Sequence, residues 1–210
     1  MTKHRLELFS DGVFAIVLTL LVLDLKLPHA LGFDGLREMI PGLLVHAATF
    51  AVVGLLWTVH HNTIAMVDEV RTPGLLCNLL ALFWLTLLPF AAKLAAEHPL
   101  DPLGPSFLAG CYGLYTASLV AARVLLKGIH EEIPAVRRYF VRRHSAYAVL
   151  ALLRLMCSGL SWVSPWWGYA GLATILSFFV LGQPSEVVRR LMLEPPAEPD
   201  LESPAPSSVE

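Results

Sequence analysis

The chain consists mainly of long apolar blocks separated by short polar segments. Each block is close to the roughly 20 residues that an α-helix needs to cross the hydrocarbon core of a bilayer. In a soluble helical protein the apolar residues would instead recur as a stripe on one face of each helix. The pattern predicts an all-α integral membrane protein with six transmembrane helices, at residues 7–27, 41–65, 74–96, 105–126, 145–163 and 166–183.

The composition supports this prediction. Hydrophobic residues make up 56% of the chain and charged residues 15%, whereas a soluble domain carries about 25% charged residues. The net charge of -2 argues against a nucleic-acid partner, because phosphate binding requires a basic face. The three cysteines lie inside apolar blocks without metal-ligand spacing and are interpreted as small hydrophobic residues. We expect membrane lipids as partners and no cofactor.

The distribution of lysine and arginine predicts the orientation, because cytoplasmic segments of membrane proteins collect these residues. With the amino terminus inside, the outer loops hold only Lys26, Arg37 and Lys93. The inner segments then hold Lys3, Arg5, Arg71, Lys127, Arg137, Arg138, Arg142, Arg143, Arg189 and Arg190. Both termini are therefore predicted to be cytoplasmic. The basic stretch 137–143 is interpreted as a linker that faces lipid headgroups, with recognition of a specific lipid as the alternative.

The chain divides into two parts. Residues 1–193 are predicted to form a six-helix transmembrane domain. Residues 194–210 are rich in Pro, Glu and Ser, cannot bury enough apolar surface to order themselves, and are predicted to be a disordered cytoplasmic tail. The opening segment of the first span does not return at the fourth span, so the internal repeat of many secondary transporters is missing.

Polar residues interrupt the start of the first apolar block, in the order Arg5, Phe9, Ser10, Asp11 and Gly12. An acidic residue inside a membrane helix is costly unless it is paired. Arg5 is one possible partner of Asp11. The alternative is an acidic residue at a helix N-terminus that is stabilised by the helix dipole, and the residues alone leave both interpretations open.

These residues resemble the R-x-x-x-F-S-D signature of the transmembrane protein 175 family of potassium channels. Late in the second block, Trp57, His60 and His61 are similar to the pattern of that family. The resemblance implies a polar network that fixes the pore-lining helix, with Arg5, Phe9, Ser10, Asp11, Trp57 and His60 as its members. Because the chain has one six-span repeat, the resemblance also implies a bacterial type of channel, a homotetramer around one pore, in a prokaryotic plasma membrane.

Counted from the motif, the resemblance places Ile16, Leu20 and Leu23 toward the pore, with Thr19 beside them. Rings of four such side chains would form a hydrophobic constriction that gates by dewetting. Since no carbonyl filter loop is present, we expect modest selectivity for potassium, which sheds water at lower cost than sodium does. The Thr19 hydroxyl either assists the ion or bonds to its own helix backbone. Asp24 would form an acidic ring at the outer mouth of the pore.

Other functions are less well supported by the sequence. A secondary cation-coupled transporter is the alternative to a channel, because Asp11 could bind a coupling cation. An enzyme is not expected, because no HExxH signature occurs and Met156 stands where a Gly-x-Ser-Gly motif would begin. His60 and His61 are expected to form structural hydrogen bonds rather than a metal site. Arg154 falls inside the fifth span and is expected to contact carbonyls, Asn78 or a polar cavity.

Overall fold

The computed structural model describes residues 2–128 and 133–174. Within these ranges the chain forms six α-helices, one 3-10 helix and one pair of short strands. In chain order they are α1 (Lys3–Leu20), η1 (Leu21–Asp24), α2 (Phe33–Ala65), β1 (Val67–Glu69), α3 (Thr72–Glu97), α4 (Leu103–Leu125), β2 (Lys127–Gly128), α5 (Pro134–Leu160) and α6 (Trp166–Ala173).

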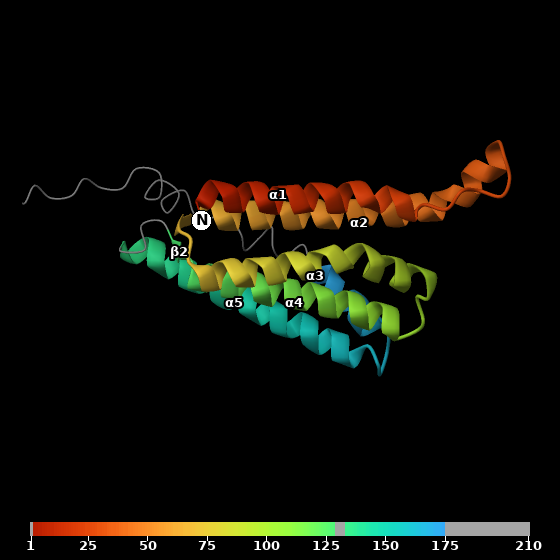
Figure 1. The fold of residues 1–210 in the computed structure, drawn as a ribbon. Helices are drawn as coiled ribbons and strands as arrows, with labels where there is room; N and C mark the ends of the chain where they lie inside the picture. The colour runs from red at the N-terminus through yellow and green to blue at the C-terminus, as the bar shows by residue number, and fades with distance from the viewer. Residues whose placement is uncertain (1, 129–132, 175–210) are drawn as a thin grey trace, which may run out of the picture.

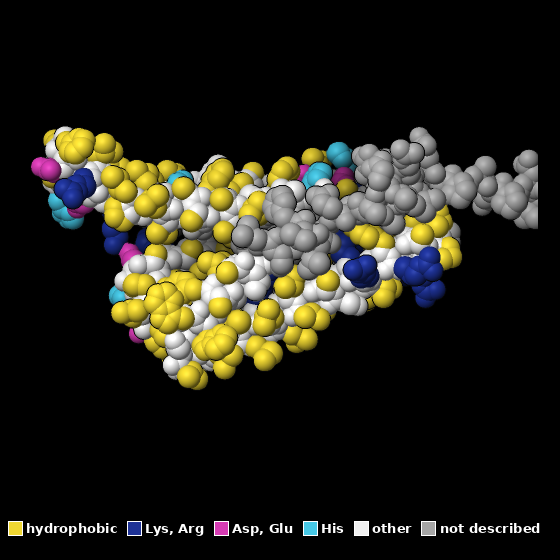
Figure 2. Space-filling view, turned by 180° about the vertical axis from the view of Figure 1, so that it is seen from behind, with side chains coloured by type: hydrophobic (Ala, Val, Ile, Leu, Met, Phe, Trp, Pro, Cys, Tyr) yellow, Lys and Arg dark blue, Asp and Glu magenta, His cyan; other side chains and the backbone are white. Residues whose placement is uncertain are grey.

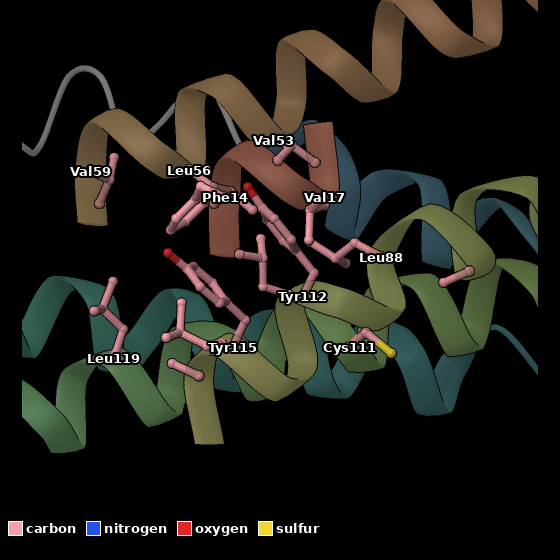
Figure 3. Close-up of a cluster of buried hydrophobic side chains, with 14 of the residues drawn as sticks. Phe14, Val17, Val53, Leu56, Val59, Leu88, Cys111, Tyr112, Tyr115 and Leu119 are labelled. Carbon is pink, nitrogen blue, oxygen red and sulfur yellow. The ribbon is translucent and has the colours of Figure 1, made fainter. Parts of the chain in front are cut away.

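The helices are arranged in two groups. Figure 1 shows α1 and α2 side by side as one long pair, with α3, α4 and α5 packed together along one side of that pair. The hydrophobic core lies where the two groups meet. Phe14 and Val17 of α1 and Leu56 of α2 point there toward Tyr112 and Tyr115 of α4 (Figure 3), and all five side chains are at least 96% buried. The pair is therefore held to the bundle mainly by the middle of α1 and the second half of α2.

A small sheet closes one end of the molecule. β1 pairs with β2 in antiparallel register, with Val67 opposite Gly128. Beneath it, Leu6, Ile64, Val67 and Leu126 form a second buried cluster. The Nζ atom of Lys3 donates a hydrogen bond of 2.6 Å to the carbonyl oxygen of Ala65 at the end of α2, where a cation complements the negative end of the helix dipole. The start of α1 is thus fixed to the end of α2.

The helices agree with the prediction in number and order, but three boundaries differ. α2 begins at Phe33, so Pro41 lies inside the helix rather than in its first turn. Gly32, with φ 75°, precedes the first turn, and Asp34 favours that turn through the helix dipole. The first span tightens into η1 after Leu20 instead of continuing to residue 27 as an α-helix.

The third difference concerns the basic stretch 137–143, which was predicted to be a linker but lies in the first turns of α5. Pro134 starts this helix, since its fixed φ suits the first turn, and arginine is a good helix former. The remainder of the sixth predicted span after residue 174, and the predicted tail 194–210, lie outside the described residues.

Four helices in the described ranges are long and apolar enough to cross a membrane: Lys3–Leu23, Phe33–Ala65, Thr72–Glu97 and Leu103–Leu125. α5 contains five arginines, which lower its hydropathy. Only 11% of the most apolar window of α2 is buried within the chain. A soluble protein could not leave such a surface uncovered, so the chain is a multi-pass membrane protein.

Candidate functional site

The polar motif of α1 lies on two different faces of the helix. Leu6, Ser10, Phe14 and Val17 form the buried face, at spacings of three and four residues. Asp11 is one position, or about 100°, further round the helix, and its side chain is 38% exposed. The motif can therefore bind two neighbouring helices at once.

Asp11 joins α1 to α2. The indole Nε1 of Trp57 donates a hydrogen bond of 2.8 Å to Oδ1 of Asp11. The Nδ1 atom of His61 lies 4.0 Å from the same oxygen, and the rings of His61 and Trp57 are 5.5 Å apart between centroids. An acidic group beside an indole N–H and an imidazole is well suited to holding two helices in register, because bonds to an ionised acceptor are stronger than neutral ones.

Ser10 joins α1 to α3. Nδ2 of Asn78 donates a hydrogen bond of 3.2 Å to Oγ of Ser10. Both residues are at least 99% buried, so no water competes for this bond. Asn78 is therefore a member of the site, although its side chain was predicted as one possible partner of Arg154. The only available signal was an amide side chain within an otherwise apolar block.

The two adjacent histidines have separate surroundings. His60 points into the core, where its Nδ1 lies 3.3 Å from the hydroxyl of Tyr115 and its ring meets Phe14 edge-on at 5.2 Å. It is His61, not His60, that lies beside Asp11. Neighbouring residues on a helix differ by about 100° in direction, and the sequence does not indicate which of the two histidines points toward α1.

The structure does not bring Arg5 to Asp11. Six residues separate them on α1, a rotation of about 240° that places them on different sides of the helix. Arg5 is exposed and makes no ion pair or side-chain hydrogen bond among the described residues. Phe9 is also exposed, at 48%. Of the predicted network, the structure therefore brings Asp11 and Trp57 into direct contact.

Another face of α1, continued by η1, carries large apolar side chains that no residue within 2–128 and 133–174 covers. Ile16, Leu20 and Leu23 are 59%, 51% and 76% exposed, and we call these three residues the α1 stripe. Leu20 and Leu23 lie above one another because the 3-10 turn has about three residues per turn. The Thr19 hydroxyl donates a hydrogen bond of 2.9 Å to the carbonyl oxygen of Ile16. The side chain of Asp24 lies outside the described part of the structure.

A groove runs beside the α1 stripe, between α1 and α3. It has a volume of about 570 Å³, and its walls include Ile16 and Leu20 on one side and Phe90 on the other. Near its end, Nζ of Lys26 lies 2.7 Å from Oε1 of Glu97. Two members of the stripe thus face open space within the single chain.

A known family model matches the part of the chain that contains the residues of this site. The family model described as the endosomal/lysosomal potassium channel TMEM175 matches residues 5–89, which include Ser10, Asp11, Trp57 and Asn78. Over this segment the chain belongs to the TMEM175 family. It is thus a member of an ion-channel family and not of an enzyme family.

Two bacterial members of the family are similar in sequence. A potassium channel of Chryseobacterium sp. is 43% identical over 93 residues, which are 44% of this chain and 48% of that protein. A potassium channel of Streptomyces collinus is 34% identical over 122 residues, 56% of this chain and 59% of that protein. The chain therefore matches about half the length of these relatives.

A solved structure shows the same fold. The crystal structure of a lysosomal potassium-selective channel TMEM175 homologue from Chamaesiphon minutus superposes with a TM-score of 0.69 at 24% identity. The superposition covers 87% of this chain and 98% of that one. The arrangement of the helices is thus that of a TMEM175 protein, including the helices beyond residue 89.

Arg154, on α5, lies outside the segment that matches the TMEM175 family model and is completely buried. Its Nη1 donates a bond of 2.7 Å to Oγ1 of Thr116, and its Nη2 one of 3.2 Å to the carbonyl oxygen of Thr174. The guanidinium also lies 4.4 Å from the centroid of the Tyr112 ring. The expected carbonyl contact is present, whereas Asn78 is bonded to Ser10 instead. Arg154 thus joins α5 to α4 and to the end of α6.

Within residues 2–128 and 133–174, no group of three or more His, Cys, Asp or Glu side chains lies close enough together to hold a metal ion. The chemistry of the site is therefore that of hydrogen bonds between helices and of an uncovered apolar surface.

Proposed function

We propose that the chain is one subunit of a homotetrameric potassium channel whose pore is lined by α1. The observation that carries this proposal is the exposure of the α1 stripe on a helix whose opposite side is packed into the core and hydrogen-bonded to α2 and α3. Membership of the TMEM175 family and the name of the Chryseobacterium relative support potassium as the permeant ion.

Four copies of the stripe around one axis would give three successive rings of Ile or Leu side chains. A narrow apolar ring releases water readily and closes to ions when it is dry. An ion that passes must shed part of its hydration shell, and potassium does so at lower cost than sodium does. The proposed constriction therefore acts as a gate and as a modest filter.

Thr19 can contribute to this filter without giving up its backbone bond. Its hydroxyl hydrogen is donated to Ile16, so the lone pairs of its oxygen remain available as acceptors. Four such oxygens beside the rings would replace part of the water lost by the ion. We propose in addition that Asp24 forms an acidic ring at the pore mouth and concentrates cations there.

The polar contacts of α1 would set the direction of the stripe. A rotation of α1 by one residue is about 100° and would turn Leu20 away from the pore axis. The bonds of Asp11 to Trp57 and of Ser10 to Asn78 oppose such a rotation from two sides. We further propose that the channel lies in a prokaryotic plasma membrane with both termini in the cytoplasm, as the distribution of Lys and Arg predicts.

Ion flux into liposomes tests the proposal. The purified protein is reconstituted, a potassium gradient is imposed, and uptake of potassium, sodium and protons is followed for the wild type, Leu20→Ala and Leu23→Ala. We expect fast potassium flux in the wild type, with increased sodium flux in both variants because the rings become wider. Val22→Ala is the matched control, since Val22 is 53% exposed on the same 3-10 turn but does not belong to the stripe.

Two results would contradict the proposal. Slow, saturable flux that is insensitive to Leu20→Ala and Leu23→Ala would indicate the transporter alternative. A molar mass in detergent that corresponds to a monomer or dimer, measured by light scattering, would remove the fourfold rings even if flux were present.

A further inference from the structure

The arginines of α5 are divided between a buried face and an exposed face. Arg143 and Arg154 are at least 94% buried and belong to the face that packs on α4. Arg143 donates a bond of 3.2 Å to Oγ1 of Thr63 and contacts Met66. Arg138 and Arg142 are exposed. They make no ion pair or hydrogen bond among the described residues, and α5 contains no Asp or Glu that would offset their charge.

The exposed face of α5 changes from cationic to apolar along its length. The outward residues recur at spacings of three and four and therefore form one stripe. This α5 stripe consists of Arg138, Arg142, Ser145, Val149, Leu152 and Met156. Its last three side chains are 63%, 61% and 63% exposed. In Figure 2 dark-blue Lys and Arg side chains lie at both ends of the molecule, and yellow side chains cover much of the surface between them.

The position of the stripe corresponds to one leaflet of a bilayer. The start of α5 lies at the same end of the molecule as the start of α1 and the small sheet (Figure 1). In a membrane with that end on the cytoplasmic side, Arg138 and Arg142 would lie at the level of the headgroups. From Ser145 to Met156 the helix rises about 16 Å, which is close to half of the roughly 30 Å hydrocarbon core.

We propose that the α5 stripe is a binding site for an anionic phospholipid. The guanidinium groups of Arg138 and Arg142, one helical turn apart, bind the headgroup phosphate from two sides. One acyl chain then lies along Val149, Leu152 and Met156. Side chains at positions i and i+4 are neighbours on a helix, and guanidinium groups bind phosphate oxygens in a fork-like geometry.

The combination of the two halves of the stripe favours a lipid over other ligands. A free phosphate would use the arginines but not the apolar half. A second copy of the chain would use the apolar half, but it would have to place an acidic group opposite two arginines at the membrane surface. A phospholipid carries the anion and the chain in the required order. This site does not depend on ion conduction by α1.

Lipid binding by the purified full-length protein can be counted by native mass spectrometry. Palmitoyl-oleoyl phosphatidylglycerol is compared with the phosphatidylcholine of the same chains. We expect a preference for phosphatidylglycerol that falls about fivefold for each arginine removed and roughly twentyfold in the double variant Arg138→Gln/Arg142→Gln. Arg138→Lys/Arg142→Lys should retain part of the preference, because lysine keeps the charge without the fork.

The matched control is Arg71→Gln/Arg137→Gln. Arg71 and Arg137 are exposed near the same end of the molecule, but Arg71 lies 3.4 Å from Glu69 and Arg137 is at the edge of the stripe. This variant loses the same charge and should retain the preference. An equal loss of the preference for phosphatidylglycerol in both double variants would show a diffuse charge effect and would overturn the proposal.

Two further measurements test whether a free anion or a second copy of the chain occupies the α5 stripe instead. Displacement of the lipid by glycerol phosphate at the same concentration would show an anion site without a chain and would overturn the proposal. Efficient cross-linking between copies through Val149→Cys, absent in the wild type, would assign the stripe to a subunit contact and would also overturn it. We expect neither result.

Discussion

The bond between Trp57 and Asp11 makes a prediction that can be tested by thermodynamic coupling. Trp57→Phe removes the indole N–H and keeps an aromatic ring against His61, whereas Asp11→Ala removes the acceptor. The bond is 2.8 Å long and has a charged acceptor. Such bonds contribute about 1.5–3 kcal/mol, but both side chains are more than one third exposed, so we expect a contribution somewhat below this range.

The double-mutant cycle isolates this bond from the other effects of each substitution. We expect Trp57→Phe to lower the free energy of unfolding by about 1–1.5 kcal/mol per subunit, and the coupling energy with Asp11→Ala to be about 1 kcal/mol. Unfolding is followed in mixed micelles with increasing denaturing detergent. His61→Phe serves as the control, since it keeps a ring beside Trp57 and leaves the hydrogen bond intact.

The same variants also test the proposed orientation of α1. If the bond holds the α1 stripe in place, Trp57→Phe should lower potassium over sodium selectivity in the flux assay although it removes no residue of the stripe. A coupling energy below about 0.3 kcal/mol, which is within the ordinary error of additivity, together with unchanged selectivity, would refute the argument.

Three further predictions follow from packing and chemistry. Gly104→Ala should destabilise the protein by about 1–3 kcal/mol, because a Cβ there would lie 2.7 Å from the backbone of α3. A Cβ at Gly54 would have no neighbour within 4 Å, so Gly54→Ala should be neutral or stabilising. Unfolding in denaturing detergent measures both variants. Arg154→Ala should cost roughly 3 kcal/mol, against less than about 0.5 kcal/mol for the exposed Arg138→Ala in detergent without anionic lipid. Thr19→Val keeps the shape of the side chain and should reduce potassium over sodium selectivity without abolishing flux, measured in liposomes.

Four of the six helices could be predicted from length and apolarity alone, because a block of about 20 apolar residues identifies a membrane-spanning segment. Their ends were less predictable. Pro41 is tolerated inside α2, and the basic stretch before residue 145 continues α5 rather than linking two spans. In both cases a local preference was outweighed by the continuation of a long helix. The strands β1 and β2 are too short to leave a pattern.

The sequence predicted several residues of the candidate site but not which side chains contact one another. Ser10, Asp11 and Trp57 could be named from the sequence, yet the partners His61 and Asn78 follow from the rotation of α2 and α3 about their own axes. An apolar helix gives no amphipathic signal for that rotation. For the same reason the uncovered face of α1 was named only through a family resemblance.

The distribution of contacts along α1 separates anchoring from the proposed conduction. Lys3, Ser10 and Asp11 make the polar contacts to α2 and α3, and all three lie in the first half of the helix. The α1 stripe lies beyond them, in a segment held by the apolar packing of buried side chains such as Phe14, Val17 and Leu21. Polar bonds define one rotation of the helix, whereas apolar contacts tolerate several. The first half of α1 therefore determines the direction in which the second half points, and changes in the motif should alter selectivity from a distance.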